Sequence, residues 1–219
     1  MHDVIILTSQ SIREVEMARR GEKRDVILDA AEEIFSEKGF HLATVDEIAS
    51  KAGVAKGTIY LYFKDKLDLF LSTMERKLIE MVSELEKVEA KVDDPVEAIS
   101  QIIALNFKFA KSHERLIRHV TPEKFKPPAD RFHGNRMPLV REKIFRPINR
   151  SIELIGRCIR RGQEKGVFKP DLDPRISSFA LSSMVRGIAF ARIIIPQLMV
   201  TNDESFEVIK TIFLDGIRR

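Results

Sequence analysis

The stretch that decides the fold is Thr44–Lys66, which reads TVDEIASKAGVAKGTIYLYFKDK. Thr44 and Glu47 have the spacing of a capping box, in which each side chain satisfies a backbone N–H at the start of a helix. Apolar residues then recur at helical spacing, and they predict a short helix over about 45–52. Gly53 supplies the permissive backbone that a tight turn requires.

A second short helix is expected from about Lys56, with Ile59 and Phe63 one turn apart on its buried face. Its other face would carry Lys56, Gly57, Thr58, Tyr60, Leu61 and Tyr62. Two helices joined by a short glycine-containing turn form a helix-turn-helix, whose second helix enters the DNA major groove. The stretch therefore predicts a DNA-binding unit.

The segment before this unit predicts another helix, over about 23–38, with an amphipathic apolar stripe. Gly39 would end that helix as a left-handed C′ residue, and Phe40 would supply the apolar contact that follows such an end. Residues 1–22 form an N-terminal extension that reads either as a loose arm or as a short helix. Its basic cluster around Arg19–Arg24 could reach DNA phosphates or could belong to a solvated tail.

The remaining chain predicts further helices. A long one over about 66–91 would lead from the DNA-binding unit into the body, with Asp65 as its N-cap. Prolines and a glycine break the pattern between residues 113 and 138, where we expect short helices and loops. Other helices are expected over about 95–112, 139–165 with a bend at Pro147, 174–195 and 203–217.

The amino-acid composition limits the class of protein to which the chain can belong. The 219 residues are 44% hydrophobic and 32% charged, as in a soluble globular protein. No apolar run reaches the ~18–20 residues of a membrane span, and the N-terminal residues do not read as a signal peptide. Cys158 is the only cysteine, so a disulfide framework or a cysteine-cluster zinc site is excluded. We expect a cytoplasmic protein that does not enter a membrane.

Charge is unevenly placed along the chain. Residues 1–110 hold 15 Lys/Arg and 21 Asp/Glu, a net charge of −6, whereas residues 111–169 hold 16 and 6, a net charge of +10. Bulk charge therefore does not argue for DNA binding by the N-terminal half, which depends on where individual cations lie. The basic segment could attract an anionic ligand. Against this, its helix 139–165 sets the arginines opposite an isoleucine stripe, as a solvated face would.

The helix KRDVILDAAEEIFSEKGF, followed by TVDEIASKAGVAKGTIYLYFKDKLDLF, resembles the N-terminal DNA-binding domain of TetR/AcrR-type bacterial transcription regulators. The resemblance covers roughly residues 23–70. It implies an all-α protein of about nine helices, in which residues 23–66 form a helix-turn-helix domain. Residues 67–219 would form a helical effector-binding and dimerisation domain.

The resemblance also implies roles for individual residues on double-stranded DNA. Thr44, Tyr60, Tyr62 and Lys66 would hold phosphates, which fixes register without reading sequence. Lys56, Gly57 and Thr58 would face base edges at the start of the recognition helix. Ala55 departs from the family pattern, because a capping Ser or Thr is common at that position.

By the same resemblance the protein would be a ligand-responsive regulator, most often a repressor, that binds a palindromic operator as a homodimer. The helices at about 174–195 and 203–217 would form the dimer interface, although their small residues also suit packing within one chain. A small apolar or anionic effector would release the DNA. Residues in the region of the expected pocket, which also suit a plain core, are Phe107, His113, His119, Met137, Phe145, Met184 and Phe190.

Catalysis finds no support in the sequence. The histidines form no helical metal pair, and no nucleophile elbow or glycine-rich phosphate loop is present, so we expect neither an enzyme nor a metal or cofactor site. Two other readings stay open. The body could bind a protein partner instead of a small molecule, or the chain could be a helical binding module without DNA recognition.

Overall fold

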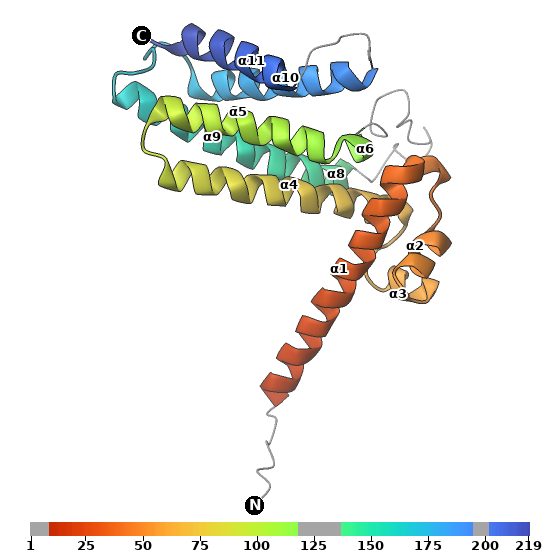
Figure 1. Ribbon diagram of the computed structural model, residues 1–219. Coiled ribbons are helices and arrows are strands. Elements are labelled where there is room, and N and C mark those ends of the chain that lie inside the picture. Colours follow the sequence, from red (N-terminus) through yellow and green to blue (C-terminus); the bar gives the residue numbers. More distant parts are fainter. Residues whose placement is uncertain (1–8, 118–136, 195–201) are drawn as a thin grey trace, which may run out of the picture. The chain divides into compact units, whose positions relative to one another are not determined.

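The computed structural model describes residues 9–117, 137–194 and 202–219, and every regular element in these ranges is helical (Figure 1). Within them the β-type pairing is one isolated antiparallel bridge between Phe168 and Arg218. The all-α prediction is confirmed. The chain divides into two compact units, Met1–Thr73 and Met74–Arg219, which we call the head and the body.

The head contains α1 (Ser9–Leu42), α2 (Val45–Lys51), α3 (Lys56–Tyr60) and the first turns of α4 (Lys66–Lys91). Its core is built from the apolar stripes of these helices, as their spacing predicts. The fully buried side chains include Ile27, Leu28, Phe35, Ile48, Ile59, Phe63, Leu69 and Phe70.

Helix α1 begins much earlier than residue 23, so the idea of a loose N-terminal arm is wrong for residues 9–22. No proline interrupts this segment, and Gly21, the one glycine before the kink, costs only about 1 kcal/mol in a helix interior. The cluster around Arg19–Arg24 is therefore carried on a helix. Residues 1–8 lie outside the described ranges.

The prediction that Gly39 ends the first helix as a left-handed residue is only partly right, because its φ angle is positive but α1 continues beyond it to Leu42. Gly39 has φ 74° and ψ 173°, a backbone conformation that is essentially restricted to glycine, and it kinks the helix there. Phe40 then turns back onto the head, with its ring centroid 5.3 Å from that of Phe70.

The boundary between the units lies later than the predicted one, which followed residue 66. Phe70, in the second turn of α4, is buried, and its ring centroid lies 5.0 Å from that of Phe35. Leu67, Leu69 and Leu71 are buried as well. The start of α4 thus completes the core of the head, which moves the boundary to Thr73 and Met74.

The body contains the rest of α4 with α5 (Pro95–Ser112), α6 (Glu114–Ile117), α8 (Met137–Val140), α9 (Arg146–Glu164), α10 (Pro174–Ile194) and α11 (Asn202–Ile217). Helix α5 packs against α9, α10 and α11. The core between these helices is formed by apolar residues, among them Ile99, Ile103, Phe107, Leu154, Ile159, Leu181, Ile209 and Phe213. The part of the expected loop region at 118–136 lies outside the described ranges.

The predicted bend near Pro147 takes the form of a π-helical turn over Arg141–Phe145, between α8 and α9. Proline lacks the backbone N–H, and its ring crowds the carbonyl one turn earlier, so a wider turn is a way to pass it. The N-cap predicted at Asp65 is present, because its carboxylate accepts from Asp68 N at 2.9 Å. Asp94 and Asp173 cap α5 and α10 in the same way, accepting from Val96 N at 2.8 Å and from Arg175 N at 2.7 Å.

Candidate nucleic-acid interface

The N-terminus of α2 is closed by the predicted capping box. The Thr44 hydroxyl accepts a hydrogen bond from Glu47 N at 3.2 Å, and Thr44 N donates to the Glu47 carboxylate at 3.0 Å. The same hydroxyl donates to that carboxylate at 2.9 Å. A phosphate that took the proton of Thr44 would therefore displace Glu47. Lys38 and Thr44 together lower the pKa of Glu47, mainly through the hydrogen bond from Lys38.

The turn between α2 and α3 follows the prediction. Gly53 has φ 65°, and Val54 N donates to Ala49 O at 3.0 Å, which closes the turn. Ala55 is the N-cap of α3 and provides no side-chain hydrogen bond. The recognition helix thus begins without a side-chain cap, as expected from the alanine.

The surface of α3 divides as its spacing predicts. Ile59 is buried, whereas Lys56, Gly57 and Tyr60 are exposed and Thr58 is half-buried. A Cβ atom added at Gly57 would meet nothing within 4 Å. Packing within the head therefore does not require a glycine there.

Lys56, the first residue of α3, is ion-paired. Its Nζ lies 2.8 Å from Asp46 Oδ2, and both side chains face solvent. The hydrogen bond that Lys56 donates to Asp46 raises the pKa of Lys56. The side chain expected to meet base edges is thus already held by a carboxylate of α2.

Lys66 has a structural role that the sequence did not reveal. Its Nζ donates to Ala43 O at 3.0 Å and to His41 O at 3.3 Å, and it lies 4.8 Å from the centre of the Phe40 ring. These contacts tie the start of α4 to the chain that follows the Gly39 kink. Lys66 therefore stabilises the head whatever it does on DNA.

The basic cluster on α1 lies beside the helix-turn-helix. The guanidinium of Arg20 lies 5.7 Å from the centre of the Tyr62 ring, and that of Arg24 lies 5.5 Å from the centre of the Phe63 ring. Arg19, Arg20, Lys23, Gly53 and Tyr62 also line one open groove. The long helical α1 is what brings these cations to the end of the recognition helix. The signal available in the sequence was that no proline lies between residues 9 and 22.

Comparison with known proteins agrees with this geometry. The family model described as "Bacterial regulatory proteins, tetR family" matches residues 27–73. The fatty acid metabolism regulator protein of Bacillus subtilis is 28% identical over 161 residues, which cover 74% of this chain and 78% of that protein. The transcriptional repressor BepR of Brucella suis is 49% identical over 59 residues, 27% of this chain and 28% of that protein.

The chain therefore contains the DNA-binding domain of a TetR-type transcriptional regulator. Proteins of this type bind DNA and respond to small molecules, and they are not enzymes. The fold agrees over nearly the whole chain: the crystal structure of the regulator FadR from Bacillus subtilis has a TM-score of 0.72 at 23% identity. That match covers 88% of this chain and 98% of that one.

In the body of the regulator, the residues proposed for an effector pocket lie in different environments. Phe107 is buried in the core, 6.4 Å from the Phe206 ring, and Met184 packs against the same core. His113 is half-buried with its Nδ1 2.9 Å from Phe109 O.

The other residues proposed for the pocket are not described in contact with Phe107, His113 or Met184. Met137 and Phe145 are exposed and line two open grooves that adjoin at Asn149 and Glu153. His119 and the side chain of Phe190 lie outside the described residues. The sequence-based set is therefore not one cavity in the part of the chain that the structure describes.

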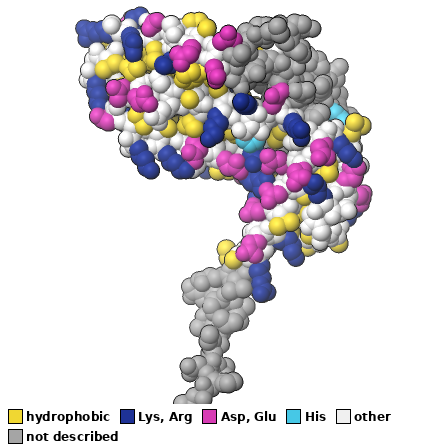
Figure 2. Space-filling model, viewed as in Figure 1, with side chains coloured by type: hydrophobic (Ala, Val, Ile, Leu, Met, Phe, Trp, Pro, Cys, Tyr) yellow, Lys and Arg dark blue, Asp and Glu magenta, His cyan; other side chains and the backbone are white. Residues whose placement is uncertain are grey.

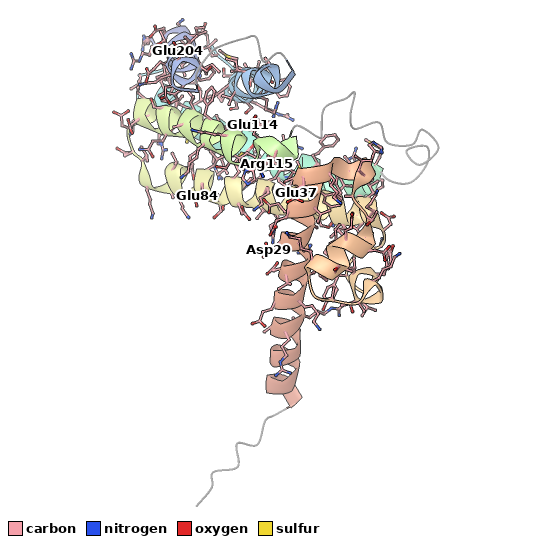
Figure 3. All side chains as sticks on the ribbon, turned by 45° about the vertical axis from the view of Figure 1, so that its right-hand side comes forward. Asp29, Glu37, Glu84, Glu114, Arg115 and Glu204 are labelled. Atoms are coloured by element: carbon pink, nitrogen blue, oxygen red, sulfur yellow. The ribbon has the colours of Figure 1, made fainter. Side chains whose placement is uncertain are left out.

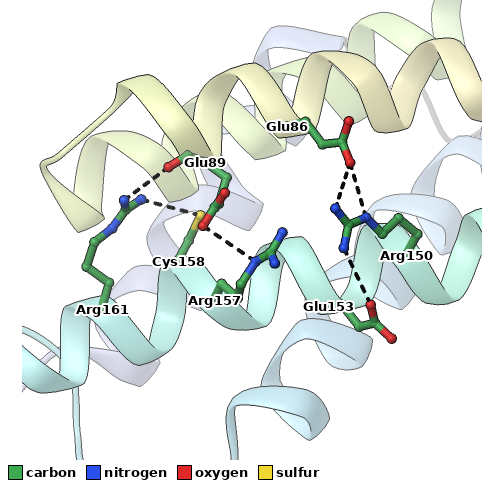
Figure 4. A network of polar contacts seen from close by, with 7 residues as sticks. All are labelled: Glu86, Glu89, Arg150, Glu153, Arg157, Cys158 and Arg161. Carbon is green, nitrogen blue, oxygen red and sulfur yellow. Dashed lines mark hydrogen bonds and ion pairs between the residues drawn. The ribbon is translucent and has the colours of Figure 1, made fainter.

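The arginines of α9 are not a freely solvated face. Arg150 donates to Glu86 at 2.8 Å, Arg157 lies 3.5 Å from Glu89, and Arg161 donates to the Glu89 carbonyl at 3.0 Å (Figure 4). These contacts join α9 to α4 and pair two arginines of the basic segment with carboxylates. An anionic ligand at these arginines would have to displace the carboxylates of α4.

Cys158 lies under this row of charges. It is fully buried, and burial raises the pKa of its thiol. Among the described residues no group of three His, Cys, Asp or Glu could hold a metal ion. None of the described helices is long and apolar enough to cross a membrane.

Proposed function

We propose that the regulator binds a palindromic operator as a homodimer and that an effector bound by the body releases it. In this proposal the head, with its helix-turn-helix, reads DNA, and the body holds the effector and the dimer contact. The protein would act in the cytoplasm as a repressor. The observation that carries the proposal is the exposed start of α3, where Lys56 and Gly57 face solvent on a helix anchored by buried Ile59.

The proposed contacts with DNA are of two chemical kinds, those to base edges and those to phosphates. Lys56 and Thr58, with the open space at Gly57, suit base edges in the major groove. Tyr60 and Tyr62 suit phosphates, helped by Arg20 and the other cations of α1. Thr44 and Lys66 would contact phosphates only in addition to the contacts that already hold them in the head.

The test is fluorescence anisotropy on duplex DNA from immediately upstream of the coding region. We expect tight, salt-dependent binding that resists competitor DNA. Tyr60→Phe should weaken binding to every sequence, since only a phosphate contact is lost, whereas Thr58→Ala should alter the preferred sequence. If both variants bind like the parent protein, the proposed reading surface is wrong.

A dimer through α10 and α11 is supported by apolar side chains that face solvent. Ile176 and Phe179 on α10 are 70% and 56% exposed, and Val208 and Ile212 on α11 are 52% and 57% exposed. Each pair lies one turn apart on its helix, so each helix presents an apolar stripe that a second copy can cover.

Sedimentation of a matched pair of variants tests this contact. Ile176→Glu should give monomers and lose operator binding, because two recognition helices are then no longer linked. Ile79→Glu places the same charge on α4 at a side chain that is 54% exposed, and it should leave the dimer intact. Dimers of equal stability in both variants would exclude this interface.

For the effector we propose an amphipathic anion, with long-chain acyl thioesters of coenzyme A as the first to test. The support is the similarity to proteins named for fatty acid metabolism, one of which was crystallised in complex with stearoyl-CoA. Adding such a thioester to the protein–operator complex should release the DNA, while the free fatty acid and coenzyme A serve as controls. No release by any of the three would exclude this class.

A further inference from the structure

The cations of the head are largely balanced by its own carboxylates. Lys38 pairs with Glu47 at 2.5 Å, Lys51 pairs with Glu33, and Lys56 pairs with Asp46 at 2.8 Å. Acidic side chains also follow α1, where Figure 3 marks Asp29 and Glu37, and Figure 2 shows acidic and basic side chains mixed over the visible face of the head. Each of these three lysines gains little from a phosphate until its ion pair opens.

Among the carboxylates that pair with these three lysines, Asp46 is the one that contacts the recognition helix, α3. It is the second residue of α2, with a side chain 67% exposed, and it reaches the Nζ of the first residue of α3. The cap of α2 is formed by Thr44 and Glu47, so Asp46 is not needed to close that helix. Its ion pair with Lys56 joins the two helices of the helix-turn-helix at their solvent face.

We propose that Asp46 is a specificity-determining residue that acts through Lys56. This role rests on the proposed function, in which α3 reads DNA, and it determines how well the protein distinguishes its operator from other DNA sequences. While Asp46 holds Lys56, a phosphate of an arbitrary sequence must compete with a carboxylate for the same ammonium group. A guanine edge offers two acceptors, O6 and N7, in the groove itself, and so compensates for the broken ion pair. Asp46 therefore weakens binding to non-operator DNA more than binding to the operator.

The experiment begins with selection of bound duplexes from a random pool by the full-length parent protein. The enriched duplex and a random duplex are then titrated by anisotropy between about 50 and 200 mM salt. Asp46→Asn is compared with Glu33→Gln, which removes the same charge and also frees one lysine, Lys51.

We expect Asp46→Asn to tighten binding to the random duplex about three- to tenfold and to steepen its salt slope by about 0.9, as one more cation becomes available to phosphate. Affinity for the enriched duplex should change less than about twofold, so the specificity ratio falls. Glu33→Gln should change both affinities less than about twofold. If Asp46→Asn does not fold, Asp46→Ser replaces it, because serine is also well tolerated in the first turn of a helix.

Three results overturn the inference. Equal tightening by Asp46→Asn and Glu33→Gln would mean that only net charge matters. Equal tightening on both duplexes would mean that specificity is not involved. An undiminished effect of Asp46→Asn in a Lys56→Gln background would mean that Asp46 does not act through Lys56. Failure to enrich any duplex would instead refute the proposed DNA reading itself.

Discussion

The head and the body both pair their charges, but over very different distances along the chain. In the head, Lys38 pairs with Glu47 nine residues away, and Lys56 pairs with Asp46 ten residues away. In the body, Arg150 meets Glu86 across 64 residues, and Lys165 meets Asp93 across 72. These ion pairs of the head thus join residues close in sequence, whereas those of the body join α9 to α4 and to the chain that follows α4.

The difference has a consequence for function. An ion pair between neighbouring short helices can open locally, as reading DNA would require of Lys56 and Asp46. The row of pairs between α4 and α9 lies along two long helices, so a shift of one helix against the other affects several pairs together. The following variants test whether the stability of the body depends on close packing between its helices, and whether the stability and DNA binding of the head depend on local backbone and side-chain geometry.

The largest effect is expected in the body, from Gly162→Ala. A Cβ at this position would lie 2.1 Å from Cδ2 and 2.9 Å from Cγ of the Phe168 ring, which is 1% exposed. Because the ring has nowhere to move, overpacking should lower the free energy of unfolding by about 3 kcal/mol. Chemical denaturation measures this. Gly216→Ala, with nothing within 4 Å of the new Cβ, is the control and should leave the body as stable or slightly more stable.

The next effect is expected in the head, from Gly39→Val. The backbone there has φ 74° and ψ 173°, which a β-branched residue adopts only with strain, so we expect a loss of about 1–3 kcal/mol. Thermal unfolding of the variant should show it, with loss of operator binding at the higher temperatures. Gly21→Ala, in open space on the same helix, should be neutral or stabilising. An unchanged head in Gly39→Val would show that the kink is not required.

A smaller effect on stability is expected from Lys66→Ala, and it should distinguish this lysine of the head from Lys56. Lys66→Ala removes hydrogen bonds to Ala43 O and His41 O, and it should destabilise the head by about 1–2 kcal/mol as well as weaken DNA binding. Lys56→Ala removes an exposed ion pair and should weaken DNA binding with less than about 0.5 kcal/mol lost in stability. Unfolding curves and anisotropy on both variants provide the comparison, and equal stabilities would contradict the structural role of Lys66.

The smallest effect is expected for single pairs between α4 and α9. A double-mutant cycle of Glu86→Gln and Arg150→Gln should give a coupling energy below about 1 kcal/mol, since both side chains are more than 40% exposed, and it should shrink as salt rises. Urea denaturation at low and high salt measures it. A coupling well above this range would mean that the pair, and not the apolar core beneath it, sets the docking of the two helices.

The parts of the fold that follow from short-range rules could be predicted. The capping box at Thr44, the positive φ at Gly53 and the N-caps Asp94 and Asp173 each depend on a few consecutive residues. The apolar faces of α2 and α3 likewise follow from helical spacing. The family resemblance of the same segment then pointed to DNA, and the exposed start of α3 is consistent with it.

What could not be predicted depends on residues far apart in sequence. The arginines of α9 read as a solvated face because Glu86 and Glu89 lie on another helix. Lys66 read as a phosphate contact because the carbonyls that it meets lie more than twenty residues away. The residues proposed for an effector pocket lie in different environments for the same reason, since the walls of a cavity are set by how several helices pack.

The sequence by itself determined how α2 is capped, where the turn before α3 lies and which residues of these two helices are buried, because hydrogen-bond capping, glycine conformation and apolar spacing act within a few residues. Only the tertiary structure decided which charges neutralise one another, where the head ends along α4, and that Asp46 holds Lys56. These depend on distances between helices, and the packing of side chains from the whole unit fixes those distances.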